Sequence, residues 1–380
     1  MENIIMIKNN WQIKKLGEVC DVIAGQSPEG IFYNSNGKGL PFYQGKKEFG
    51  EKYIEEPRIW TTKITKKAQK NDILMSVRAP VGPINFSTQE ICIGRGLAAI
   101  RPNEKVNYNF LFYFLLSKQD GIIGNAGAVF ASINKYDIEN LNIYISSLPE
   151  QHRIVKILDD VFEKIAKAKE NVEKNLQNSK ELFESYLQNI FSNPGKDWDE
   201  KNLGEFIKLE YGKPLDKKDR NSNGKYPVYG ANGEKDRSDK FYYNHSTIII
   251  GRKGSAGEMN LTEDKFWPLD VTYFVTFNDK KFDLKFIYFL LLTLKLTKLA
   301  KGVKPGINRN EVYSINVFVP GLLEQKQIVA KLDALSAETK KLEEIYKKKL
   351  ADLEELKKSV LKKAFSGGVI GCLKIKHKIA

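Results

Sequence analysis

The sequence predicts an α+β fold in which two mixed α/β domains, related by a pseudo-two-fold axis, are separated by two long antiparallel helices of coiled-coil type. Three observations support this prediction. The chain repeats itself, each repeat ends in a long apolar stripe with helical spacing, and each repeat begins with short strand-like segments.

The repeat relates residues 1–192 to residues 193–366. Residues 150–159 and residues 324–333 share six of ten positions, in the pattern Glu-Gln-x-x-Ile-Val-x-x-Leu-Asp. Further repeated motifs are Ile133-Asn134 with Ile307-Asn308, Phe191-Ser192 with Phe365-Ser366, and Trp11–Glu18 with Trp198–Glu205. Two copies are too few for a solenoid, so the repeat indicates a duplicated domain.

Each repeat ends in an apolar stripe that advances by three or four residues, which is typical of a long amphipathic helix. In the first repeat the stripe comprises Ile154, Leu158, Val161, Ile165, Ala168, Val172, Leu176, Ser179, Leu182, Tyr186 and Ile190. In the second it comprises Ile328, Leu332, Leu335, Thr339, Leu342, Tyr346, Leu350, Leu353, Leu356, Val360 and Ala364. Neither helix can bury its stripe alone, so we expect the two helices to pair with each other, antiparallel, with one domain at each end.

Breaker residues delimit the helices. Asn193-Pro194-Gly195 ends the first helix and Gly367-Gly368 ends the second. The predicted division of the chain is a first domain at 1–147, a central helix at 148–193, a second domain at 194–321, a C-terminal helix at 322–366 and a basic tail at 367–380.

The segments before each helix alternate short strands with Gly, Asn and Pro clusters. Strand-like runs occur at residues 72–77, 91–93, 246–250 and 271–277. Each segment also holds one apolar helical stretch, at 108–117 and at 283–294. This mixture predicts two α+β domains with mixed or curved sheets.

Composition narrows the class of protein. The net charge of +14 and the pI of about 9.3 favour a polyanionic partner, with nucleic acid ahead of a membrane surface. Cys20, Cys92 and Cys372 are far apart and odd in number, which argues against a disulfide framework or a thiolate zinc site. No signal peptide is recognisable, and the apolar runs at 110–116 and 286–292 are too short to span a bilayer. We therefore expect a cytoplasmic protein.

No catalytic signature is found in the sequence. The spacing Gly251-x-x-Gly254-x-x-Gly257 fits neither the phosphate-binding loop nor the dinucleotide fingerprint. The three histidines are scattered, and His152 aligns with Lys326 of the second repeat, which favours a polar surface role. The loops of both domains instead combine Lys and Arg, which bind phosphates and guanine, with Asn and Gln, which can pair with adenine. Any one such loop is also typical of a solvated turn, so the prediction rests on the set and on its occurring twice.

The repeated helix motifs carry a family resemblance. Glu324–Val329, followed by Leu356–Gly367 at the end of the helix, resembles the C-terminal helical region of the DNA-specificity (S) subunits of type I restriction-modification systems. Residues 148–192 resemble the spacer helix of that family, although Phe191-Ser192 replaces a fuller Ala-Phe-Ser-Gly ending. The two Trp-x4-Leu-Gly-Glu motifs are similar to the start of its target recognition domains. The resemblance extends to about Gly368.

Membership of this family would imply a non-catalytic reader of double-stranded DNA. Each target recognition domain would read one half of a bipartite, asymmetric sequence, and the helices would fix the gap. Two modification subunits would dock on this chain, bind S-adenosylmethionine and methylate an adenine in each half-site. Restriction subunits that use ATP and Mg²⁺ are further expected partners, and this chain itself would hold no cofactor and no metal.

Residue roles in these loops vary across the family and are not transferred from it. The candidate contact residues are therefore chosen from the composition of the loops. Basic residues expected to contact DNA are Lys46, Lys47, Lys63, Arg78, Arg95, Lys213, Lys217, Arg220, Arg252, Lys253, Lys304 and Arg309. Candidates for base-edge or sugar contacts are Tyr43, Gln44, Tyr229, Asn232 and Asn308.

Other interpretations stay open at this point. A duplicated coiled-coil scaffold that binds only protein would explain the helices but not the paired basic loops. A nuclease or methyltransferase acting by itself is a second alternative, and a specificity subunit from another class of restriction-modification system is a third.

Overall fold

The computed structural model describes residues 11–122, 132–262 and 265–365. The chain divides into two compact units. Unit 1 comprises residues 1–172 together with 349–380, and unit 2 comprises residues 173–348. Both long helices are therefore shared between the units, and each unit is described by itself. The predicted basic tail, 367–380, lies outside the described residues.

The described residues of unit 1 form three sheets. Its strands are β1 Gln12–Lys15, β2 Cys20–Ala24, β3 Tyr33–Asn34, β4 Leu40–Tyr43, β5 Trp60–Thr61, β6 Lys67–Ala68, β7 Ile73–Ser76, β8 Ile84–Phe86, β9 Ile91–Ile93, β10 Leu97–Pro102 and β11 Asn142–Ile145. The strand orders are β2-β10-β7-β8, β3-β5-β4-β9-β6 and β1-β11. Two helices, α1 Tyr108–Lys118 and α2 Lys135–Glu139, precede the long helix α3 Leu148–Ser192.

Unit 2 repeats the same plan. Its strands are β12 Asp199–Asn202, β13 Ile207–Tyr211, β14 Tyr226–Gly230, β15 Gly233–Ser238, β16 Ile248–Gly251, β17 Met259–Leu261, β18 Trp267–Pro268, β19 Thr272–Phe277 and β20 Asn316–Val319. The strand orders are β13-β19-β16-β17, β15-β14-β18 and β12-β20. Helices α4 Leu284–Thr293 and α5 Arg309–Tyr313 precede α6 Leu322–Phe365. The four-stranded and two-stranded sheets match those of unit 1, whereas the remaining sheet differs.

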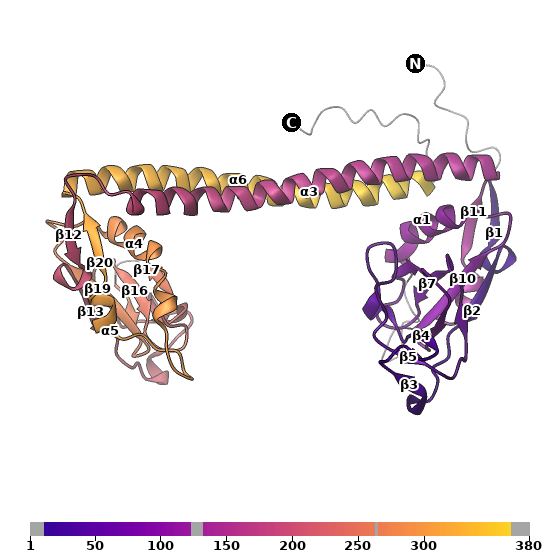
Figure 1. Cartoon of the computed structure of the whole chain (residues 1–380), viewed down its shortest axis with the longest axis horizontal. Helices are drawn as coiled ribbons and strands as arrows, with labels where there is room; N and C mark the ends of the chain where they lie inside the picture. The colour runs from indigo at the N-terminus through magenta and orange to yellow at the C-terminus, as the bar shows by residue number, and fades with distance from the viewer. Residues whose placement is uncertain (1–10, 123–131, 263–264, 366–380) are drawn as a thin grey trace, which may run out of the picture. The chain divides into compact units, whose positions relative to one another are not determined.

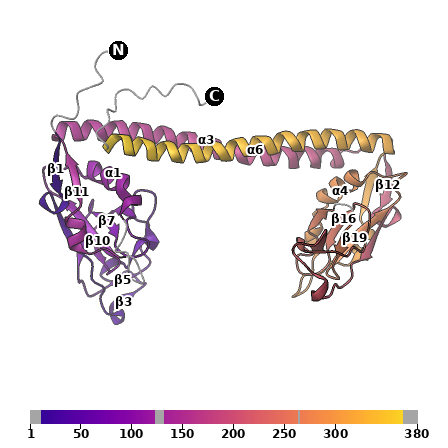
Figure 2. The ribbon, with the colours of Figure 1, turned by 180° about the vertical axis from the view of Figure 1, so that it is seen from behind.

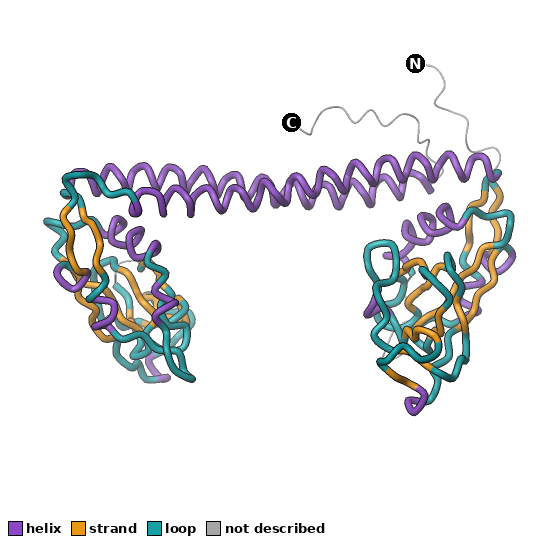
Figure 3. Tube along the Cα trace, viewed as in Figure 1, coloured by secondary structure: helices purple, strands orange, loops and turns teal. Residues whose placement is uncertain are grey.

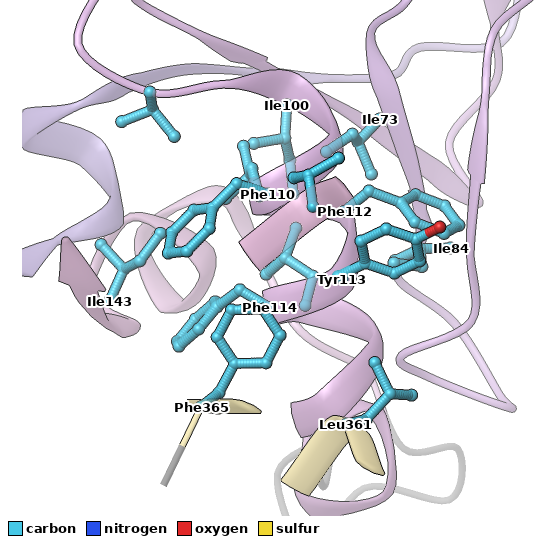
Figure 4. Close-up of a cluster of buried hydrophobic side chains, with 14 of the residues drawn as sticks. Ile73, Ile84, Ile100, Phe110, Phe112, Tyr113, Phe114, Ile143, Leu361 and Phe365 are labelled. Atoms are coloured by element: carbon cyan, nitrogen blue, oxygen red, sulfur yellow. The ribbon is translucent and has the colours of Figure 1, made fainter. Parts of the chain in front are cut away.

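The core of unit 1 is built around α1, which is apolar on nearly all sides. Asn107 caps this helix by accepting a hydrogen bond from the backbone N–H of Phe110 at 3.0 Å. Figure 4 shows Phe365, from the end of α6, beside Phe110 and Phe114 of α1. The centroid of the Phe365 ring lies 5.4 Å from that of Phe110 and 5.6 Å from that of Phe114. The last turn of α6 is therefore part of this core.

The long helices pack together with opposite directions. In unit 1 the first turns of α3 share a core with the last turn of α6, and Lys169 Nζ lies 2.9 Å from Glu354 Oε1. In unit 2 Leu187, near the end of α3, shares a core with Ile328 and Leu332, near the start of α6. The start of each helix thus meets the end of the other, which confirms the antiparallel prediction (Figures 1 and 2).

The predicted apolar stripe holds along α6 but not along all of α3. Every predicted position of α6 is buried or half-buried, and the Thr339 hydroxyl donates to Leu335 O at 3.0 Å. In α3, however, Leu182 and Tyr186 are exposed, and Phe183 and Leu187 take their place. The prediction was wrong there because the step after Ser179 is four residues, which puts the larger Phe183 ring beside Phe289 at 6.2 Å.

Candidate nucleic-acid interface

Loops gather at the end of each domain remote from its long helices. Figure 3 shows this within each unit, where strands lead away from the helices and loops cover the far end. Buried strands of the four-stranded sheets lead into loops that hold candidate contact residues, Arg78 after β7 and Arg252 after β16. Rigid strands that end in polar loops are a common way to position binding side chains.

Two arginines lie close to one tyrosine ring in unit 2. The guanidinium carbon of Arg252 lies 5.3 Å from the centroid of the Tyr211 ring, and that of Arg309 lies 5.2 Å from it. Tyr211 ends β13, Arg252 follows β16 and Arg309 begins α5. Cation–π attraction places two like charges near the same ring, and a phosphate group bound by both arginines would relieve their repulsion. We call these three residues the Tyr211 cluster.

Backbone hydrogen bonds connect this cluster to a neighbouring loop. Ile307 N–H donates to Arg252 O at 3.1 Å, and Gly254 N–H donates to Pro305 O at 2.9 Å. Lys253 and Gly306 form a β-bridge. The structure therefore brings five predicted contact residues to one surface, termed the Arg252 surface: Arg252, Lys253, Lys304, Asn308 and Arg309.

Polar side chains of the Arg252 surface also have local structural roles. The Arg252 guanidinium donates to Asp270 O through Nη2 at 2.6 Å and through Nε at 3.1 Å. Asn308 caps α5, accepting a hydrogen bond from Asn310 N–H at 2.9 Å. Tyr273 packs against Tyr211. Burial raises the pKa of Tyr273 to about 12, and the hydrogen bond to Tyr211 is the next cause. The positive charges of Arg252 and Arg309 lower this pKa. Tyr273 is thus neutral at physiological pH.

The other candidates of unit 2 are dispersed. Lys213 Nζ lies 4.9 Å from the centroid of the Tyr242 ring, and Lys217 and Asn232 are exposed on separate loops. The Arg220 guanidinium donates to Leu215 O at 2.9 Å and 3.1 Å, which shapes its own loop. Tyr229 is 8% exposed and packs against Phe266 in the core. We therefore remove Tyr229 from the candidate base contacts.

Unit 1 has a polar cluster of a different kind. The Ser27 hydroxyl donates to Gln44 Oε1 at 2.8 Å and accepts from Arg95 N–H at 3.1 Å. A Cβ atom at Gly96 would lie 2.5 Å from the backbone carbonyl oxygen of Gln44, so this close approach requires glycine there. Gln44 and Arg95, both predicted contacts, are therefore brought together at the surface.

The remaining candidates of unit 1 behave differently from one another. Lys46 and Lys47 are exposed, whereas Lys63 Nζ lies 3.0 Å from Glu29 Oε1 and 4.8 Å from the centroid of the Phe32 ring. Tyr43 is 1% exposed, its hydroxyl donates to Glu55 O at 2.9 Å, and burial raises its pKa to about 12. Tyr43 therefore belongs to the core and is also removed from the candidate contacts.

Arg78 and Lys253 occupy matching places in the two units. Each residue lies just beyond the end of the third strand of its four-stranded sheet, and each forms a β-bridge with the residue before the repeated Ile-Asn motif, Ser132 or Gly306. The Asn of that motif caps a short helix in both units.

The sequence-based candidate set left out Tyr211. Its position next to Gly212 and Lys213 was the signal that could have included it.

No metal centre emerges from the described part of the chain. Within residues 11–122, 132–262 and 265–365, no group of three or more His, Cys, Asp and Glu side chains could hold a metal ion. In the same part, every helix is too short or too polar to cross a membrane.

Comparisons with known proteins agree with this architecture. The sequence model of the "Type I restriction modification DNA specificity domain" family matches residues 8–175 and 195–352. A provisionally named type I restriction enzyme MjaX specificity subunit of Methanocaldococcus jannaschii is 43% identical over 176 residues, 44% of this chain and 41% of that protein. The type I restriction enzyme MjaIX specificity subunit of the same organism is 25% identical over 236 residues, 54% of each chain. The matched segments thus span about half of each relative's length.

Two solved structures share the fold over nearly the whole chain. One, described as the structural basis underlying complex assembly and conformational transition of the type I R-M system, gives a TM-score of 0.77 at 19% identity and covers 95% of this chain and 98% of that chain. The HsdS subunit from Thermoanaerobacter tengcongensis gives 0.63 at 18% identity and covers 97% and 100%. Because its family model matches both halves of the repeat, this chain belongs to the type I restriction-modification DNA specificity family.

Proposed function

We propose that this chain is the specificity subunit of a type I restriction-modification enzyme and that it binds double-stranded DNA without catalysing a reaction. Family membership supports the role of specificity subunit. The basic Arg252 surface and the Gln44–Arg95 cluster support DNA as the ligand. Arginine forks and lysines suit phosphates and guanine, and the amide of Gln44 suits adenine.

The target is a bipartite, asymmetric sequence, with one half-site for each domain. The observation that carries this proposal is the contrast between the shared and the unshared sheets. In the described residues, both units keep a four-stranded sheet of the same order and a two-stranded sheet, but unit 1 adds a five-stranded sheet and unit 2 a three-stranded one. The same scaffold therefore presents unlike loops, and unlike loops read unlike sequences.

The long helices fix the gap between the half-sites. Helix α3 has 45 residues and α6 has 44, and each is continuous from one unit into the other. At a rise of about 1.5 Å per residue, a helix of this length extends over roughly 65 Å. Paired helices resist bending, so only particular gaps are permitted.

The remaining subunits supply the chemistry. Two modification subunits bind S-adenosylmethionine and methylate an adenine in each half-site, and restriction subunits that use ATP and Mg²⁺ can join the complex. The target recognition domains correspond to residues 1–147 and 194–321, with the spacer helices between and after them.

The test is to co-express the chain with its genomic neighbours that encode modification subunits and to map modified adenines in the host DNA. A split motif with a fixed gap is expected. Methylation that is lost on deleting this chain, together with binding that weakens steeply with salt, would support DNA recognition. A chain that binds protein but no DNA would favour the scaffold alternative, and methylation or cleavage by the chain alone would favour an enzyme.

A further inference from the structure

Val303 is fully exposed at the tip of a short hairpin in unit 2. Its relative exposure is 105%, the largest among the exposed apolar side chains of the described residues. Two backbone hydrogen bonds close the hairpin, Lys301 N–H to Gly306 O and Gly306 N–H to Lys301 O, each at 3.0 Å. Gly302, with a φ of +94°, permits the turn. The side chain is thus presented on a defined backbone.

The hairpin is tied to the Arg252 surface. Gly306, at the C-terminal end of the hairpin, forms the β-bridge to Lys253, and the carbonyl oxygen of Pro305 accepts the hydrogen bond from Gly254 N–H. At its near end, Lys301 Nζ lies 2.7 Å from Glu311 Oε1 of α5, the helix that begins with Arg309. A ligand held by the Tyr211 cluster therefore meets this hairpin in a fixed position.

An isolated exposed valine is ordinary on a protein surface. Here, however, cationic residues adjoin the hairpin: Lys304 follows Val303 directly, Arg252 lies on the segment bonded to the hairpin, and Arg309 begins α5. A phosphate-binding surface needs no apolar side chain at its tip. DNA offers one exposed apolar group beside its phosphates and polar base edges, the C5-methyl group of thymine in the major groove.

We propose that Val303 packs against the methyl group of a thymine in the half-site read by the second domain and so selects an A·T pair there. This proposal rests on the proposed function. Valine is short and β-branched with a stiff χ1, which suits it to cover a methyl group. Side chains that wedge between stacked bases are usually longer, such as Phe, Leu, Ile or Met.

The experiment replaces thymine by uracil, which removes only the methyl group. The complex of full-length chain and modification subunits is titrated with its target duplex, in which each dT of the second half-site is exchanged in turn for dU. For the wild-type chain, one position should weaken binding about three- to fivefold, the value of one buried methyl group. Val303→Ala should weaken binding to the dT duplex and remove the dU effect at that position alone.

Matched controls separate this contact from other effects. Leu323→Ala removes another exposed apolar side chain of unit 2, at the start of α6, and should leave the dU profile unchanged. Because Val303 carries no charge, its replacement should leave the salt dependence of binding unchanged, whereas loss of a phosphate contact would reduce it. Thermal unfolding of Val303→Ala should match that of the wild type.

Two results would overturn the proposal. They are a wild-type complex indifferent to every dT-to-dU exchange, and a Val303→Ala complex with an unchanged dU profile. Each would leave the proposed function intact, because sequence preference would persist. A wild-type complex with no sequence preference would instead reject both proposals.

Discussion

Gln151 Oε1 accepts a hydrogen bond from the backbone N–H of Asn107 at 2.8 Å. The amide of Gln151 also donates to Ser146 O at 2.8 Å and to Lys105 O at 3.1 Å, and its side chain is fully buried. Since Asn107 caps α1, this one side chain joins the first turn of α3 to the start of the core helix. The hydrogen bonds explain why a glutamine, rather than any polar residue, stands in the helix motif.

Gln325 makes the equivalent contacts in unit 2. It accepts from the N–H of Asp283, the cap of α4, at 2.9 Å and donates to Pro320 O at 2.9 Å and to Lys281 O at 3.3 Å. The Glu-Gln repeat is therefore a connection between each recognition domain and its long helix.

Replacing Gln151 by Ala should destabilise unit 1 by about 2 to 3 kcal/mol, because buried backbone groups lose their partners. Hydrogen exchange should quicken in α1 of unit 1 but not in α4 of unit 2, and Gln325→Ala should reverse this pattern. Gln177→Ala serves as the control, because Gln177 is an exposed helical glutamine that bonds only to Glu181 at the surface. Equal exchange in the Gln151 and Gln177 variants would contradict the assigned role.

The sequence predicts the long helices well because their burial is periodic. A stripe that advances by three or four residues specifies both the helix and its buried face, and a duplicated stripe specifies the partner. The failure at Leu182 and Tyr186 has the same origin: steps of three and four are equally helical, so the position of the larger Phe183 decided which residues are buried.

The candidate site is less predictable, because it depends on contacts between residues distant in sequence. Tyr43 and Tyr229 each directly precede a polar, glycine-containing segment, yet both are buried, and their strands pair with the distant strands β9 and β18. The Tyr211 cluster likewise joins three separate elements. No local pattern distinguishes a tyrosine that stacks on arginines from one that fills a core.

Arg252→Ala should weaken DNA binding by about 1 to 3 kcal/mol and relax sequence preference in one half-site only. Arg252→Lys should recover part of the affinity but not the preference, since lysine lacks the planar fork. Binding selections with randomised half-sites provide the measurement. Arg153→Ala, which removes an exposed arginine paired with Glu150 on α3, is the matched control. Unchanged affinity and unchanged methylation in Arg252→Ala would reject the assignment.

Cys20 should resist thiol reagents while the chain is folded. Burial, aided by the charge of Asp21, raises the pKa of its thiol from 9.0 to about 12, so at pH 8 the reactive thiolate is scarcer than in an unfolded chain. Cys92 is also buried. In a Cys372→Ser variant, mass spectrometry should find no alkylated cysteine after brief exposure to iodoacetamide at pH 8, and two in urea. Rapid alkylation of Cys20 in the folded chain would show that unit 1 opens readily.

The gap between half-sites should follow the length of the helix pair. Copying residues 166–172 after Val172 in α3 and residues 344–350 after Leu350 in α6 adds one heptad to each helix and keeps both apolar stripes in phase. Seven residues add about 10 Å, which corresponds to roughly three base pairs. Mapping of modified adenines should therefore reveal both half-sequences unchanged and a gap longer by about three.

The heptad placed in α3 alone provides the contrast. It leaves α3 one heptad longer than its partner, so the faces that bring Lys169 to Glu354 and Leu187 to Ile328 cannot both be kept. This variant should unfold at a lower temperature and methylate DNA weakly. If the doubly extended chain methylated the original motif with the original gap, the helices would not fix the spacing, and the loops alone would have to determine it.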